Sequence, residues 1–168
     1  MAIVELRALP RLLPPRSRLL GLDLGEKTIG LAIATSDLSL ASPLETIQRT
    51  KFTEDAQRLA DICREQRVGG LVLGLPLNMD GSEGKRARST RQFARNLEEL
   101  AGFTLPIAYW DERLSTAAIE RFLVEDVDMS RRRRGQVVDK MAAAFILQGA
   151  IDALRNWNNS GSERLDKN

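Results

Sequence analysis

The stretch that decides the fold is LLGLDLGEKTIGLAIA, residues 19–34. Two apolar runs flank a short turn with glycine, which predicts an antiparallel hairpin with strands over residues 18–24 and 29–36. One carboxylate, Asp23, stands where an aliphatic residue is expected. Burying an ionised Asp among aliphatic side chains is costly unless it is paired or holds a cation. The alternative is that Asp23 caps the turn through a side-chain hydrogen bond.

The chain after the hairpin alternates strands and helices. The pattern predicts strands over residues 44–49, 71–75 and 106–110, and helices over residues 54–66, 85–101, 115–124 and 137–156. The run LVLGL at residues 71–75 is continuously apolar, which is typical of a strand covered on both faces. We therefore expect an α/β fold, with a mixed five-stranded sheet that starts as an antiparallel hairpin, continues with parallel strands and carries helices on both faces.

The length of 168 residues indicates a single domain, which we place at residues 18–157. Residues 1–17 contain three prolines and three arginines, and we expect a disordered extension there. Residues 158–168 are polar and are expected to form a mobile tail. Because no apolar run approaches the roughly 20 residues that span a bilayer, a membrane location is excluded and a cytoplasmic one expected.

Composition removes several kinds of chemistry. The chain has no histidine, which excludes Ser-His-Asp and Cys-His catalysis and histidine zinc sites. Its single cysteine, Cys63, cannot form an internal disulfide, and it lies in a helical pattern typical of a buried thiol. Any catalysis must therefore depend on carboxylates, lysine, arginine, hydroxyls or a bound metal.

Three carboxylates stand at places that the sheet could bring together. Asp23 lies on the first strand, Glu112 at the carboxyl end of the last strand and Asp139 near the start of the final helix. Ligands in open α/β sheets gather outside the carboxyl ends of the strands. Converging carboxylates repel unless protons or hard cations such as Mg²⁺ or Mn²⁺ intervene, and such a site can hydrolyse phosphodiesters. The alternatives are an ion pair of Glu112 with Arg113 and a helix-end role for Asp139.

Five blocks of the sequence resemble the motifs of the YqgF family, also called RuvX. They are LGLDLG at residues 20–25, KTIG at 27–30, GLPLNMDGSEG at 74–84, DERLST at 111–116 and DKMAAAFILQ at 139–148. They occur in the family's order, and the resemblance extends over residues 19–154. Members of this family are assigned as pre-16S rRNA nucleases and as Holliday junction resolvases.

The resemblance implies an RNase H-like fold, a cytoplasmic location and removal of extra nucleotides from the 5′ end of the 16S rRNA precursor. It also implies that Asp23, Glu112 and Asp139 are the catalytic, metal-binding acids for Mg²⁺ or Mn²⁺. One position departs from many RNase H-like nucleases, which carry a carboxylate where this chain has LP at residues 75–76. The nearest acid there is Asp80, so the second acid of the site stays open.

Polar and basic residues near these acids are candidates for contacts with substrate phosphates. They are Lys27, Asn78, Arg113, Arg131, Arg132, Arg133 and Arg134. Clustered arginines can follow a nucleic-acid backbone, although a run of charge is usually a solvated face. The loop that contains Asn78 has the alternative of an ordinary glycine-rich turn.

The leading interpretation is a metal-dependent nuclease that acts on structured RNA, with a four-way DNA junction as the alternative substrate. A second class is a nucleotide phosphotransferase with a similar Asp-x-Gly hairpin, although such enzymes generally need two domains of this kind. A third is a non-catalytic RNA-binding or transcription-associated factor. A monomer would suit trimming of an RNA end and a homodimer would suit a junction, so both states stay open.

Overall fold

The computed structural model describes the backbone of residues 2–114 and 131–165 and the side chains of residues 2–113 and 138–160. The strands are β1 (Arg18–Leu24), β2 (Thr28–Ala34), β3 (Ala41–Gln48), β4 (Val68–Leu75) and β5 (Ile107–Asp111). The helices described are η1 (Leu6–Ala8), α1 (Leu9–Leu12), α2 (Phe52–Glu65), α3 (Lys85–Glu99), η2 (Glu112–Leu114) and α5 (Arg131–Leu165). The expected helix over residues 115–124 lies outside the described residues.

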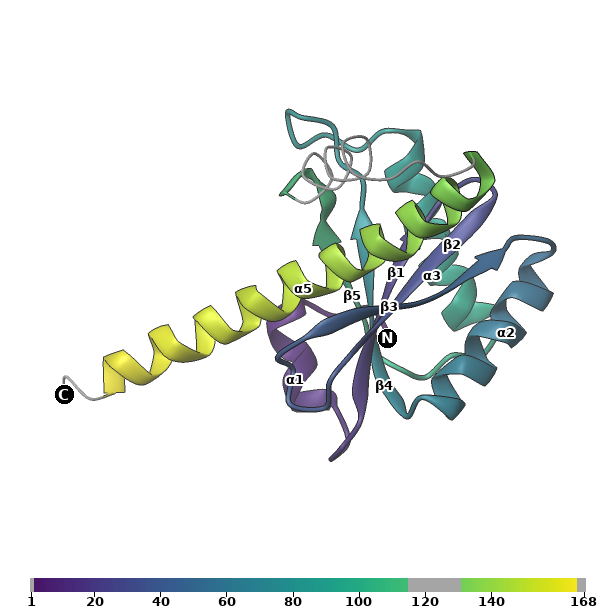
Figure 1. The fold of residues 1–168 in the computed structure, drawn as a ribbon. Helices are drawn as coiled ribbons and strands as arrows, with labels where there is room; N and C mark the ends of the chain where they lie inside the picture. Colours follow the sequence, from purple (N-terminus) through teal and green to yellow (C-terminus); the bar gives the residue numbers. More distant parts are fainter. Residues whose placement is uncertain (1, 115–130, 166–168) are drawn as a thin grey trace.

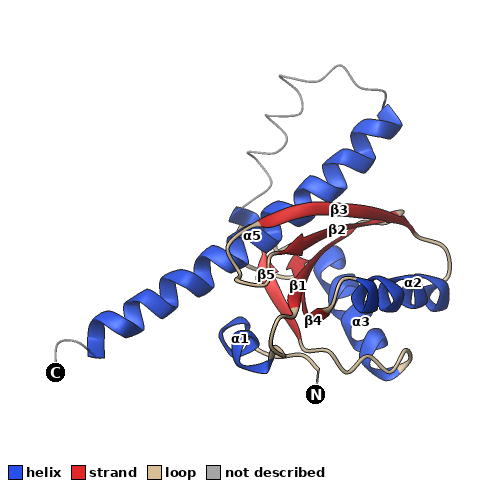
Figure 2. Ribbon diagram, turned by 60° about the horizontal axis from the view of Figure 1, so that its bottom comes forward, coloured by secondary structure: helices blue, strands red, loops and turns tan. Residues whose placement is uncertain are grey.

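The five strands form one mixed sheet in the order β3-β2-β1-β4-β5. β2 pairs with β1 and with β3 in antiparallel fashion, whereas β4 pairs with β1 and with β5 in parallel. α5 crosses one face of this sheet, and α2 and α3 cover the other face (Figures 1 and 2). The expected α/β fold, with an antiparallel hairpin followed by parallel strands, is confirmed.

Strand alternation divides the core into two layers, because successive side chains point to opposite faces. Leu20 and Leu22 of β1 pack in the cluster that includes residues of α2 and α3. Leu19 belongs to the second cluster, with Ala143 and Leu147 of α5. By the same alternation Asp23 lies on the α5 face, near the carboxyl end of its strand.

The amino-terminal segment differs from the disordered extension that we expected. The backbone N–H of Val4 donates to the carbonyl of Ile107 at 2.8 Å, and the N–H of Ile107 donates to the carbonyl of Ala2 at 2.7 Å. Leu9 is fully buried in the layer beneath α5. β5 is the edge strand of the sheet, and an unpaired edge is a liability that proteins commonly cover. The apolar residues of the segment cover this edge, so the segment is ordered.

α5 is longer than the predicted helix. It begins at Arg131 and continues through Leu165, past residue 157, where we had placed the start of a mobile tail. No proline interrupts residues 137–165, and Trp157 is anchored by the guanidinium of Arg7, 4.3 Å from its ring centroid. No helix in the described part of the chain is long and apolar enough to cross a bilayer.

Candidate active site

The sheet brings Asp23, near the carboxyl end of β1, close to Glu112, which directly follows the carboxyl end of β5. β4 separates β1 from β5 in the sheet, and its Gly74 leaves open the space between the two acids. A Cβ added at Gly74 would overlap the Glu112 carboxylate and the end of the Ile146 side chain from α5. Gly74 is therefore what admits the Glu112 side chain to the α5 face, where Asp23 also lies.

Asp23 and Glu112 share a hydrogen bond and both are partly buried. Burial, followed by the negative charge of Asp23, raises the pKa of Glu112 from 4.5 to about 8. Burial also raises the pKa of Asp23, although the hydrogen bond from Glu112 opposes that effect. The hydrogen bond favours a protonated Glu112 that donates to Asp23, so Glu112 keeps its proton at neutral pH.

Asp139 of α5 is held against β2. The Thr28 hydroxyl donates a hydrogen bond to Oδ2 of Asp139. A Cβ added at Gly30, two residues further along β2, would overlap the backbone of Asp139. Because Asp23 pairs with Gly30 in the β1–β2 register, this close approach sets Asp139 across from Asp23. The charge of Asp139 contributes to the raised pKa of Asp23.

One cation lies within electrostatic reach of the acidic pair. The positive charge of Arg86, the second residue of α3, acts to lower the pKa of both Asp23 and Glu112. The sequence analysis did not include Arg86 among the residues expected near these acids. The only signal was its position shortly after the loop that follows β4.

The described residues contain no group of three histidine, cysteine or acidic side chains arranged to hold a metal ion as they stand. Asp23 and Glu112 are hydrogen-bonded to each other, whereas Asp139 accepts a hydrogen bond from Thr28. The donor set still suits a hard cation, since all three side chains offer carboxylate oxygens. A divalent cation would offset the repulsion that now keeps a proton in the pair.

The other predicted contacts have varied surroundings. Lys27 is exposed in the β1–β2 turn. The amide of Asn78 donates to the Ser82 hydroxyl at 2.9 Å, so it stabilises its own loop. The guanidinium of Arg113 donates hydrogen bonds to both carboxylate oxygens of Asp111. It also donates to the carbonyl of Met79 at 3.2 Å.

Arg113 therefore ties the end of β5 to the loop after β4, in addition to any contact with substrate. The four predicted arginines at the start of α5 lie in a helical backbone, but their side chains fall outside the described residues. They are Arg131, Arg132, Arg133 and Arg134. Their role in binding substrate stays a prediction.

Comparison with known proteins gives a family match over most of the chain. A family model described as "RuvX: Holliday junction resolvase" matches residues 17–153. The chain belongs to the RuvX family. One RuvX relative, from Phenylobacterium zucineum, is 57% identical over 156 residues, which cover 93% of this chain and 99% of the relative. Another, from Roseobacter denitrificans, is 61% identical over 143 residues, covering 85% of this chain and 87% of the relative. Both carry the name "Putative pre-16S rRNA nuclease".

Solved structures similar to this RuvX chain include "T. thermophilus RuvC in complex with Holliday junction substrate". That match has a TM-score of 0.48 and 15% sequence identity, and it covers 82% of this chain and 94% of the other. The yeast mitochondrial Holliday junction resolvase Ydc2 matches with a TM-score of 0.45 and 13% identity, over 92% of this chain and 89% of the other.

Proposed function

We propose that this protein is a metal-dependent nuclease that hydrolyses phosphodiester bonds in the maturation of the 5′ end of pre-16S rRNA. The observation that carries the proposal is the hydrogen-bonded pair of Asp23 and Glu112 at the carboxyl ends of β1 and β5, with Asp139 held beside them. Clustered, partly buried carboxylates destabilise a folded protein unless protons or cations offset their repulsion, so their presence here favours a functional role. The names of the RuvX relatives supply the substrate.

In this proposal Asp23, Glu112 and Asp139 hold Mg²⁺ or Mn²⁺. A bound divalent ion lowers the pKa of water and stabilises charge on the phosphate oxygens. Asp23 and Glu112 lie at the ends of β1 and β5, on either side of β4, so they offer oxygens from a rigid base, whereas Asp139 comes from a helix that packs across the sheet. Since the pair holds a proton, cation binding and proton release are coupled.

The surrounding residues act on these acids or on the substrate. Thr28 fixes the orientation of the Asp139 carboxylate through its hydroxyl. Lys27, Arg113 and the arginines at the start of α5 contact phosphates of the nucleic-acid backbone. Such contacts would make affinity depend on salt and little on sequence. We also propose a cytoplasmic location, where the rRNA precursor is found.

The test is cleavage of a labelled 16S rRNA precursor fragment with Mg²⁺, Mn²⁺ or EDTA. We expect cutting that requires the metal and is lost in the Asp139→Asn variant. The control is Asp61→Asn on α2, which removes one carboxylate from the helix layer on the opposite face of the sheet and is expected to cut normally. Metal-independent cutting, or full activity of Asp139→Asn, would overturn the proposal.

A four-way DNA junction is a second candidate substrate, because the matching family model is described as a Holliday junction resolvase. The same assay with a labelled junction separates the two. Cutting of the junction alone would favour the resolvase activity. Binding of either substrate without turnover would instead support a non-catalytic nucleic-acid-binding role.

A further inference from the structure

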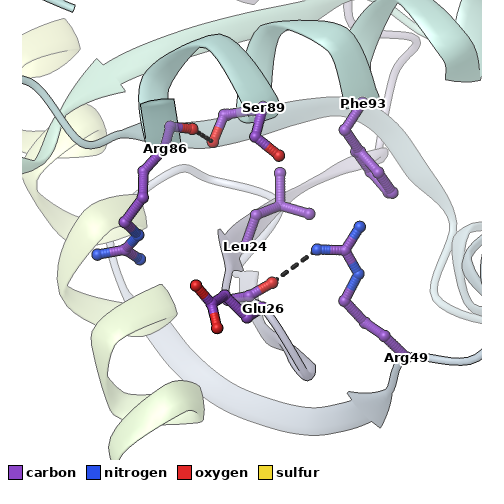
Figure 3. A pocket seen from close by; sticks show the side chains of 8 residues that line it. Leu24, Glu26, Arg49, Arg86, Ser89 and Phe93 are labelled. Carbon is purple, nitrogen blue, oxygen red and sulfur yellow. Dashed lines mark hydrogen bonds between the residues drawn. The ribbon is translucent and has the colours of Figure 1, made fainter. Parts of the chain in front are cut away.

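A pocket opens between the β1–β2 turn and α3 (Figure 3). Leu24, Gly25 and Glu26, which follow Asp23 directly in the chain, form one wall. Arg86 and Ser89 of α3 contribute to the other. The pocket has a volume of about 50 Å³, several times the ~10–15 Å³ that one ordered water needs. The pocket therefore has room for more than a single water molecule.

Arg49, the residue after β3, supplies a guanidinium that is already fixed in this pocket. Its Nη1 donates to the carbonyl of Gly25 at 2.6 Å, and its Cζ lies 5.7 Å from the centroid of the Phe93 ring. These two contacts hold the side chain, and among the described residues the guanidinium donates no further hydrogen bond. A guanidinium held in place loses less conformational freedom when it binds a phosphate.

Arg86 provides the second positive charge and connects the pocket to the acids. Its side chain leaves α3 toward α5, on the opposite side of Leu24 from Arg49 (Figure 3). It also acts electrostatically on both Asp23 and Glu112. An anion bound near Arg86 would therefore lie close to the bond that these acids are proposed to cut.

Glu26 opposes this charge. It is exposed, and it lines the same pocket. Two guanidinium groups against one carboxylate leave the pocket with a net positive charge. A pocket with this charge favours an anion, and guanidinium groups form strong charge-assisted hydrogen bonds with phosphate oxygens.

We propose that this pocket binds a backbone phosphate of the strand that is cut, next to the scissile phosphate. Arg49 and Arg86 supply the positive charge and the Ser89 hydroxyl is within the same lining. The proposal rests on the proposed nuclease function and adds the subsite that places the strand. It gives a role to Arg49, which the motif pattern does not mark.

The test measures binding of a fluorescently labelled single-stranded RNA oligonucleotide by fluorescence anisotropy. EDTA is present so that no strand is cut. For single strands, the slope of log K against log salt changes by about 0.7 for each phosphate contact. We expect Arg49→Gln and Arg86→Gln each to lower that slope, by up to about this amount, because the two arginines share one phosphate. Glu26→Gln is expected to bind more tightly, because it removes the opposing charge.

Arg88→Gln is the matched control. It removes the same charge from the same helix, but Arg88 lies two residues from Arg86 and hence about 200° around the helix axis. Its Nη1 donates to the carbonyl of Glu83, away from the pocket. We expect its salt slope to stay near that of the unmodified protein. An equal loss in Arg88→Gln would overturn the pocket as a specific site.

A second experiment locates the phosphate. A set of oligonucleotides carries one uncharged methylphosphonate at successive positions, and each is bound by the unmodified protein and by Arg49→Gln. At one position the loss of affinity from the methylphosphonate and the loss from Arg49→Gln should not be additive, because both changes remove the same contact. Additive losses at every position would overturn the proposal.

Failure of the subsite and failure of the proposed function give different results. If the unmodified protein cuts RNA while Arg49→Gln and Arg86→Gln keep its full salt slope, only the subsite is wrong. If the unmodified protein neither binds nor cuts nucleic acid, the proposed function is wrong and the subsite falls with it. Thermal unfolding of each variant confirms that it is folded.

Discussion

At the scale of single residues, the acidic pair illustrates a conflict between stability and the proposed function. Asp23 and Glu112 are partly buried side by side, and burial raises the pKa of both carboxyls, while the charge of Asp23 raises that of Glu112 further. The folded protein limits this cost by keeping a proton between them. A cation could take the place of that proton, so the arrangement that destabilises the metal-free protein is the one that suits a metal site.

This pair predicts how stability depends on pH without metal. The pKa of Glu112 is raised from 4.5 to about 8 in the folded protein, so the folded state holds the proton more strongly than the unfolded state. Its contribution is fully present below about pH 4.5 and is lost as the pH rises through about 8, with a slope of up to about 1.4 kcal/mol per pH unit.

We therefore expect the free energy of unfolding in EDTA to fall between pH 5 and 8.5, and to fall less steeply in Glu112→Gln. Urea unfolding across this range measures both slopes. Added Mg²⁺ should stabilise the unmodified protein more at pH 8 than at pH 5, since protons compete with the cation. Identical slopes for the two proteins would show that Glu112 does not hold the proton.

Thr28 gives a second prediction at this scale, because its hydroxyl orients the Asp139 carboxylate. Thr28→Val keeps the shape of the side chain and loses the donor, so we expect cleavage that needs a higher Mn²⁺ concentration and is about 10-fold slower, as for other residues that orient metal ligands. Thr28→Ser keeps the donor and should restore the metal dependence. Rates measured over a range of Mn²⁺ concentrations, with thermal unfolding alongside, separate this effect from a loss of stability.

At the scale of elements, the close approach of α5 to the sheet depends on small residues. A Cβ added at Gly21 would lie 2.8 Å from Cβ of Leu147 and 3.1 Å from the carbonyl oxygen of Ala143. Gly21→Ala should therefore push α5 from β1 and lower the free energy of unfolding by about 1–3 kcal/mol, as overpacking does.

The control for this prediction is Gly84→Ala, where the nearest atom to an added Cβ is 3.4 Å away and the backbone φ is −88°. That change should alter stability little. Urea unfolding of both variants provides the comparison. If Gly21→Ala were as stable as the unmodified protein, α5 would not be packed on β1 as closely as the structure shows.

How far the sequence could predict these elements depends on how local their causes are. The hairpin of β1 and β2 and the buried strand β4 follow from apolar patterns and turn residues that lie close together in the chain. The acids were predicted because each stands at a strand or helix end. Thr28 and Gly74 could not be assigned to the site, because their roles depend on which residues of α5 and η2 come to lie against them.

At the scale of the whole molecule, the amino-terminal segment joins parts that are far apart in sequence. Its backbone pairs with β5, Ala2 donates its N–H to Glu98 at 3.0 Å, and Leu9 is buried in the layer beneath α5. Composition alone, with three prolines and three arginines in residues 1–17, favoured disorder. Long-range pairing with an edge strand leaves no local signal, which is why the sequence prediction failed here.

Two leucines of this segment test whether it is part of the folded domain. Leu9 is fully buried, whereas Leu12 is 50% exposed. Leu9→Ala should lower the free energy of unfolding by about 2–5 kcal/mol, as in other buried leucines, and Leu12→Ala by no more than about 0.5 kcal/mol. Both variants remove the same atoms from one four-residue helix, so the difference between their urea unfolding midpoints isolates burial. Equal midpoints would mean that the segment does not pack on the sheet, and that β5 and α5 hold together without it.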